Sequence, residues 1–293
     1  MPIRRFFIDA VVCLAFAGGL LAADSKGNPG GNPRSNPGTD PKASRTTVWE
    51  SLVLDGRKAV GNEDYPTAEQ FFLRALHEAE GFPAGDARAG TTANMLGLVY
   101  REEKKYREAE ESFTKALAVM DKAYGPESLD TANVMLNLAT VLLTERRYDA
   151  ALPYLQKSQA VYLKLLGEGS MKAASTLCMA GQAYTEMKKL SEAEASLKKC
   201  ADAREASGGI DNADFGDALY SLGLVYQQEG RYPMAEQALK MAEKIREVAL
   251  GITSPGFADA LEAHASVLRQ LGRAGEAAKD EAMAAAIRSK KKK

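Results

Sequence analysis

Apolar and small positions return at a fixed interval along most of the chain. The clearest is an aromatic or other apolar residue followed three positions later by alanine. It occurs at Tyr65/Ala68, Tyr106/Ala109, Tyr148/Ala151, Leu190/Ala193, Tyr232/Ala235 and Ala274/Ala277. The alanine numbers differ by 41 once and then by 42 four times, and a fixed period of this kind is typical of stacked structural repeats. The pattern therefore predicts six repeats.

Two further positions are small in all six units. Twelve residues before each alanine lie Gly56, Gly97, Ala139, Gly181, Gly223 and Ala265, and seven residues after it lie Ala75, Ala116, Ser158, Cys200, Ala242 and Ala284. Two helices can cross closely only where their side chains are short. Each repeat is therefore predicted to be a pair of antiparallel helices that touch at the small positions, with the turn between them at the aromatic or apolar residue three positions before the alanine.

The segments LGLVY (96–100), KKYREAEESFTKAL (104–117) and RYPMAEQALKMA (231–242) carry a family resemblance. In their order of small and aromatic positions they resemble the tetratricopeptide repeat (TPR) family, and their long unit is similar to the kinesin light chain form. The resemblance covers about residues 48 to 287. It implies an all-α, right-handed solenoid of antiparallel helix pairs, about six repeats of 42 residues, that binds other proteins and catalyses no reaction.

The resemblance also implies a binding surface, because the first helix of each pair lines the concave groove in this family. Counting from the small positions places there Asn94, Leu98, Arg101, Asn133, Leu136, Thr140, Thr144, Ser175, Gln182, Thr185, Asp217, Tyr220, Leu224, Gln227, Asp259, Glu262 and Arg269. Amide and hydroxyl groups can bond the backbone of an extended peptide, and leucine and tyrosine can hold its side chains. The alternative, that these residues simply face solvent, stays open at this point.

The N-terminus predicts export. Residues 1–23 combine Arg4 and Arg5 with the apolar run from Ala10 to Ala23, as a cleaved signal peptide does. An uncleaved anchor is the alternative, but it would carry Asp9 into the lipid, which is costly. Residues 24–45 are rich in Pro, Gly and Asn and predict a disordered linker. The solenoid is then predicted over residues 46–288, followed by a Lys-rich tail at 289–293, in a periplasmic or secreted protein.

Charge and residue inventory exclude several classes of function. The chain has 38 Lys and Arg against 39 Asp and Glu, so it lacks the basic surplus of a nucleic-acid-binding protein. Its two histidines, His77 and His264, have no companions at ligand spacing, and neither a phosphate-binding loop nor a nucleophile elbow occurs. The sequence therefore predicts no catalytic residue, no metal ligand and no cofactor.

Cysteine usage leaves one question open. Cys178 and Cys200 both belong to the fourth unit, and an exported protein can form a disulfide there. We expect unfavourable geometry, however, because the two positions should point to different sides of the second helix.

The terminal units depart from the pattern in ways that suggest caps. Asp55 and Ala59 replace larger apolar residues in the first unit, where Trp49 is expected to cover the exposed end. His264 and Glu281 make the sixth unit more polar. The sequence as a whole predicts an exported, non-catalytic scaffold that binds a protein or peptide partner. The alternative is a subunit that associates with copies of itself through these end repeats.

Overall fold

The computed structural model describes residues 41–208 and 212–290, which form twelve α-helices and no strand. The predicted signal peptide (1–23), linker residues 24–40 and the last three residues of the Lys-rich tail lie outside this part of the chain. None of the described helices is both long and apolar enough to cross a membrane.

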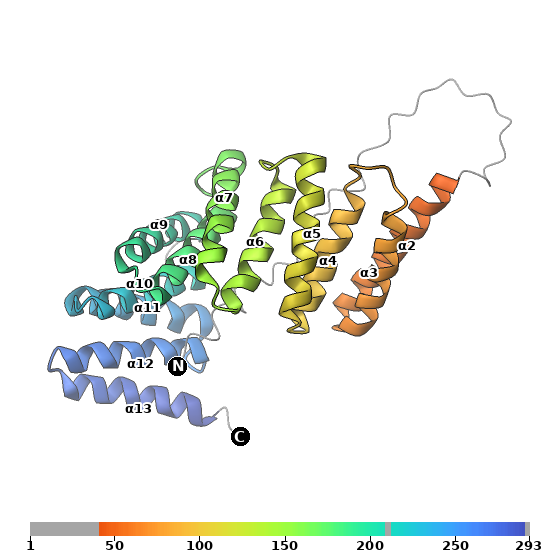
Figure 1. Ribbon diagram of the computed structural model, residues 1–293. Helices are drawn as coiled ribbons and strands as arrows, with labels where there is room; N and C mark the ends of the chain where they lie inside the picture. Colours follow the sequence, from red (N-terminus) through yellow and green to blue (C-terminus); the bar gives the residue numbers. More distant parts are fainter. Residues whose placement is uncertain (1–40, 209–211, 291–293) are drawn as a thin grey trace. The chain divides into compact units, whose positions relative to one another are not determined.

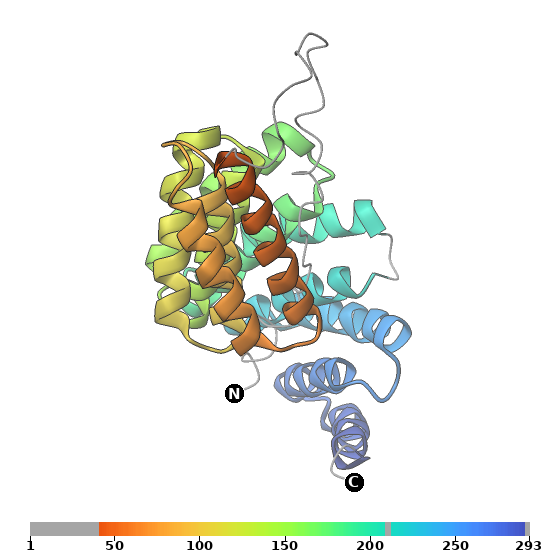
Figure 2. The same ribbon diagram turned by 90° about the vertical axis from the view of Figure 1, so that its right-hand side faces the viewer.

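The chain divides into two compact units, Met1–Ala123 and Tyr124–Lys293. Unit 1 contains α2 (Pro41–Gly61), α3 (Tyr65–Ala79), α4 (Arg88–Glu102) and α5 (Tyr106–Tyr124), which lie side by side in Figures 1 and 2. Unit 2 contains α6 (Leu129–Thr144), α7 (Tyr148–Leu166), α8 (Met171–Glu186), α9 (Leu190–Gly208), α10 (Ala213–Gln228), α11 (Tyr232–Leu250), α12 (Pro255–Gln270) and α13 (Ala274–Lys290).

Each of the two compact units is a stack of helix pairs, and this confirms the predicted architecture. In unit 2, α7, α9, α11 and α13 each pack against the first helix of their own pair, and α7, α9 and α11 also pack against the first helix of the next pair. Among the first helices, α10 also contacts both α8 and α12, so these three form a continuous row. In unit 1, α3 packs against both α2 and α4.

Turn residues recur with the same period as the core. Ser128, Ser170, Asn212 and Ser254 cap the first helices of unit 2, each accepting a hydrogen bond from a backbone N–H of the first turn. Such side-chain caps satisfy amide groups that have no partner within the helix. Between the two helices of a pair the backbone turns through a left-handed residue, with φ between 58° and 77° at Glu63, Lys104, Arg146, Lys188, Gly230 and Gly272.

The small positions lie where the helices of a pair meet. A β-carbon added to Gly97 would stand 2.6 Å from the Phe113 ring, and one on Gly223 would stand 2.6 Å from Leu239 Cγ. Added to Gly181, it would lie 2.5 Å from Leu197 Cγ. The alanines and serine at these positions are also fully buried: Ala75, Ala109, Ala116, Ala139, Ala151, Ser158, Ala193, Ala235, Ala242, Ala265 and Ala277.

Three details differ from the sequence-based expectation. Helix α2 begins at Pro41, inside the segment expected to be linker, and α13 continues through Ser289 to Lys290. Trp49 does not cover an exposed end. Only 8% of it is exposed, and its indole N–H donates to Thr92 Oγ1 of α4 at 3.0 Å. Trp49 therefore joins α2 to the next helix pair, because the indole needs a buried hydrogen-bond acceptor.

Candidate functional site

A row of polar contacts joins the two helices of every pair in unit 2 at the same place. The contacts are Tyr162 to Asn133, Arg204 to Ser175, Arg246 to Asp217 and Arg288 to Asp259. Each joins a second-helix residue to a first-helix residue 29 positions earlier, and we call these four contacts the polar ladder. The ladder fixes the second helix of each pair against the edge of the first.

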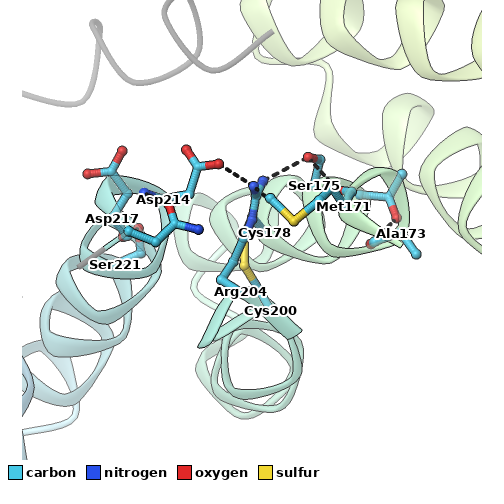
Figure 3. The surroundings of a disulfide bond; sticks show 11 residues. Met171, Ala173, Ser175, Cys178, Cys200, Arg204, Asp214, Asp217 and Ser221 are labelled. Atoms are coloured by element: carbon cyan, nitrogen blue, oxygen red, sulfur yellow. Dashed lines mark hydrogen bonds and ion pairs between the residues drawn. A yellow bond between two sulfur atoms is a disulfide. The ribbon is translucent and has the colours of Figure 1, made fainter. Parts of the chain in front are cut away.

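Three rungs of the ladder also reach the first helix of the following pair. Lys172 donates to Asn133 Oδ1 at 2.6 Å, beside the Tyr162 hydroxyl at 2.9 Å. Arg204 bridges Ser175, at 2.8 Å, and Asp214, and Figure 3 shows its guanidinium between them. Arg246 donates to the carbonyl of Gly256 at 3.0 Å. The ladder therefore connects successive pairs as well as the helices within them.

The rung formed by Arg246 and Asp217 contains a buried charge that is fully paired. Arg246 is fully buried, donates to Asp217 at 2.7 Å, and stacks on the ring of Tyr220 at 4.1 Å. Burial raises the pKa of Asp217 although Arg246 opposes the shift, and burial raises the pKa of Tyr220 to about 12. A buried arginine is tolerated only when it is paired in this way. The carboxylate of Asp217 is thus engaged within the fold.

Several residues predicted to bind a partner are placed inside this framework. Thr140 is 3% exposed and Tyr220 is 5% exposed. The hydroxyls of Thr140, Thr144 and Thr185 each donate at 2.8 Å to a carbonyl four residues earlier in their own helix. Asn133 is a rung of the polar ladder. These side chains hold helices together or satisfy backbone groups.

Other predicted residues remain accessible on the row of first helices. Gln182, Leu224 and Gln227 are partly exposed on α8 and α10, and Ser266 of α12, which was not predicted from the sequence, is exposed as well. The Gln227 amide donates to Ser266 Oγ at 2.8 Å and so bridges α10 and α12. We call these four residues the first-helix face. Leu136 on α6 is also partly exposed, as are Asn94, Leu98 and Arg101 on α4 of unit 1, where Arg101 pairs with Glu102 at 2.8 Å.

The two cysteines of the fourth repeat form a disulfide. Cys178 of α8 and the fully buried Cys200 of α9 have Cα atoms 5.3 Å apart, and Figure 3 shows the bond beside Arg204. The expectation that they point to different sides of the second helix is therefore wrong, because Cys178 packs directly against the small position that Cys200 occupies. A cross-link that closes a loop as long as the segment from Cys178 to Cys200 stabilises a fold by about 3 kcal/mol.

A shallow pocket lies elsewhere in the same region. Its lining includes Gln156 and Gln159 of α7, Tyr184 of α8 and Lys199 of α9, and Gln156 donates to the Tyr184 hydroxyl at 3.3 Å. The second helices α7 and α9 and the first helix α8 all line the pocket, but none of its lining residues belongs to the first-helix face.

The sequence-based expectation for the second histidine is wrong in one respect, since His264 does have acidic companions. Its Nδ1 lies 3.1 Å from Glu243 of α11 and 2.9 Å from Asp280 of α13. Burial lowers the pKa of His264, but the two carboxylates more than offset this and raise it above its ordinary value. The three residues stand on three different helices, so no short spacing in the sequence could reveal them. His77, in contrast, is exposed beside Glu80.

The arginines of the ladder were not predicted from the sequence. Arg204, Arg246 and Arg288 are separated by 42 residues, as are their partners Ser175, Asp217 and Asp259. This shared recurrence is the signal that could have found them.

The helix pairs and their repeated contacts define a repeat protein of the helical-array class. Models of the tetratricopeptide repeat match residues 60–122, 88–164, 130–206 and 216–248, which together cover more than half of the chain. The chain therefore belongs to the tetratricopeptide repeat family, whose members bind protein partners and are generally non-catalytic.

Solved structures share this fold. BtubC (BKLC) from P. vanneervenii is 24% identical, with a TM-score of 0.64 over 72% of this chain and 84% of that chain. A kinesin light chain-like repeat protein of Podosopora anserina is 18% identical, with a TM-score of 0.59 over 69% and 95%. PilW, a type IV pilus biogenesis factor, is 20% identical, with a TM-score of 0.59 over 80% and 91%. No curated protein matches the chain.

Proposed function

We propose that the chain is an exported, non-catalytic scaffold that binds an extended segment of a partner protein along the first-helix face. The observation that carries the proposal is the continuous row of α8, α10 and α12, on which Gln182, Leu224 and Gln227 remain partly exposed. Membership in a family of protein-binding scaffolds supports it.

The chemistry of the face favours an extended, largely uncharged peptide. Carboxamides such as those of Gln182 and Gln227 can donate to and accept from a peptide backbone, while Leu224 offers an apolar contact between them. Three acids of these first helices are paired with arginines of the ladder: Asp217 with Arg246, and Asp259 and Glu262 with Arg288. Because the ladder also holds the helices in place, the face loses little conformational freedom on binding.

The disulfide supports export. Bonds such as Cys178–Cys200 persist in oxidising compartments and are rare in a reducing cytosol. Together with the signal-like segment at residues 1–23, it favours a location in the cell envelope or outside the cell. The structural relatives range from a kinesin light chain-like protein to a pilus biogenesis factor, so no particular partner follows from them.

Affinity capture from the native cell envelope tests the proposal. The full-length chain is compared with a face variant, Gln182→Lys with Leu224→Lys, and with a matched variant of α7, Gln156→Lys with Gln159→Lys. We expect a partner that the parent and the α7 variant retain and that the face variant loses, while circular dichroism shows equal helix content in all three.

Two other results would contradict the proposal. Loss of the partner from the α7 variant alone would place binding at the pocket formed by α7, α8 and α9. Capture of nothing except further copies of the chain, by all three proteins, would favour the self-associating subunit instead.

A further inference from the structure

Three potential metal ligands converge near the C-terminus of unit 2. Glu243 of α11, His264 of α12 and Asp280 of α13 each place one ligand atom within 4.8 Å of the other two. His264 is 7% exposed, whereas the side chains of Glu243 and Asp280 retain 24% and 20% exposure. The imidazole thus forms the floor of the cluster, and the carboxylates stand toward solvent.

The imidazole lacks hydrogen bonds although it is buried. Both ring nitrogens of His264 are shielded from solvent without a hydrogen-bond partner among the described residues, and so is Oδ2 of Asp280. Both carboxylates lie within 3.1 Å of the same Nδ1 atom, yet neither is aligned with it as a hydrogen-bond acceptor. A buried polar group without a partner is costly, so this arrangement requires an explanation.

Packing of the repeat does not require these three residues. The position of His264 holds Leu96, Leu138, Ala180 and Leu222 in the second to fifth repeats. The position of Asp280 holds Ser112, Tyr154, Ser196 and Ala238, and that of Glu243 holds Leu117, Gln159, Ala201 and Ala285 in other repeats. None of these alternatives carries a charge. Only at the boundary of the last two repeats do all three positions become ligands together.

We propose that Glu243, His264 and Asp280 bind a divalent transition-metal ion of the Zn²⁺ class. In a tetrahedral site with metal–ligand bonds of about 2.0–2.2 Å, neighbouring ligand atoms lie roughly 3.3 Å apart. The distances of 3.1 and 2.9 Å from Nδ1 to the two carboxylates are close to this value. Three protein ligands leave a fourth position for water or an external group.

The ion would neutralise and connect groups that the fold brings together at a cost. Two carboxylates beside one imidazole leave net negative charge even when the imidazole is protonated, and a divalent cation offsets it. The ligands come from α11, α12 and α13, so the bound ion would join the last helix pair to the pair before it. Metal binding would then stabilise the C-terminal end of unit 2, because a ligand that binds only the folded state raises its stability.

Metal binding to the purified full-length chain tests the proposal. After removal of metals with a chelator, the chain is dialysed against micromolar Zn²⁺, and bound metal is measured by elemental analysis. Co²⁺ serves as a second probe, because tetrahedral Co²⁺ absorbs strongly in the visible range. We expect one equivalent of metal per chain and a rise in melting temperature that the chelator reverses.

Each substitution at the cluster introduces the residue that occupies the equivalent position in another repeat of this chain. His264→Leu installs the residue found at Leu222, and Asp280→Ser installs the residue found at Ser196, so both should fold. We expect each to lose the bound metal and the rise in melting temperature. His77→Leu removes the other, exposed histidine and should bind metal like the parent.

Absence of stoichiometric Zn²⁺ and Co²⁺ from the parent chain would overturn the proposal and leave the cluster as a buried ion triad. Equal binding by the parent and by folded His264→Leu would overturn it as well, because the metal would then lie elsewhere.

Discussion

At the scale of single residues, the close approach of paired helices depends on side chains that are absent or minimal. Gly223 illustrates this, since an added β-carbon would lie 2.6 Å from Cγ and 2.8 Å from Cδ2 of Leu239. Leu239 is itself fully buried, so it has little room to move away. A single methyl group at this point must therefore displace one helix of the pair.

Replacing Gly223 with alanine should lower stability by about 1–3 kcal/mol, because it overpacks the contact between α10 and α11. Urea denaturation monitored by circular dichroism measures the effect. Gly275→Ala is the matched control, since no atom lies within 4 Å of the added β-carbon there. A control variant that is destabilised as much as Gly223→Ala would refute the explanation by packing.

The sequence could predict these small positions because each requirement is local and recurs. The sequence could not predict the role of a residue when that role depends on a neighbour in another helix. Arg246 is the single arginine among the lysines and glutamates of a charged second helix, and only the fold shows that it is buried on Tyr220. His264 had no companion within a short spacing, because its companions stand on the helices before and after its own.

At the scale of helices, the polar ladder is what distinguishes one pair from another. In the second helix pair of unit 1, α4 and α5, the equivalent positions hold Thr91 and Met120, neither of which is charged, whereas α10 and α11 of unit 2 use Asp217 and Arg246. The same geometry can therefore be built with or without charge. The buried ion pair is then one of two solutions, and removing only half of it should be worse than replacing both partners.

Substituting Met for Arg246 should destabilise the fold by about 3 kcal/mol, because it strands the Asp217 carboxylate and removes the bond to Gly256. The double variant Arg246→Met with Asp217→Thr recreates the pair used in unit 1 and should regain at least half of the loss. Chemical denaturation of the parent, the single variant and the double variant decides the matter. A double variant no more stable than the single one would show that the charge pair has no uncharged equivalent here.

At the scale of the whole molecule, a second set of ion pairs links one helix pair to the next. An acid directly after the repeat alanine of a second helix contacts a base at the turn of the following pair. The pairs are Glu69–Lys105 in unit 1 and Glu194–Arg231 and Glu236–Arg273 in unit 2. Tyr100 and Tyr226 add hydroxyl bonds to Glu69 and Glu194 at 3.1 and 3.2 Å. Because repeats touch only their neighbours, such links carry stability along the array.

The overall architecture was predictable from the period, because six units with the same three small positions allow little except stacked helix pairs. Which of the predicted groove residues remain accessible was less predictable. Thr140 and Tyr220 were predicted to face a partner and are buried, since counting from the small positions gives a residue's angle around the helix but not the depth of the neighbouring side chains. The disulfide was misjudged for a different reason, because the two cysteines were expected on different sides of the second helix and in fact face one another.

The links between repeats predict how stability depends on pH. Hydrogen bonds from Lys198 and then from Arg231 lower the pKa of Glu194 from its ordinary 4.5 to about 2. Between these values the unfolded chain binds a proton that the folded chain does not, so acidification favours unfolding. The contribution of Glu194 is complete above about pH 5 and is lost as the pH falls toward 2. Glu194→Gln should therefore lower the urea midpoint at neutral pH.

The difference between this variant and the parent should shrink steadily below about pH 5, because protonation removes the same charge from the parent that the substitution removes. Glu192→Gln, an exposed position on the same helix, controls for the loss of one negative charge and should follow the parent at every pH. If the difference for Glu194→Gln stayed constant from neutral pH to the acid limit, the carboxylate would act through packing alone. The links between repeats would then owe little to charge.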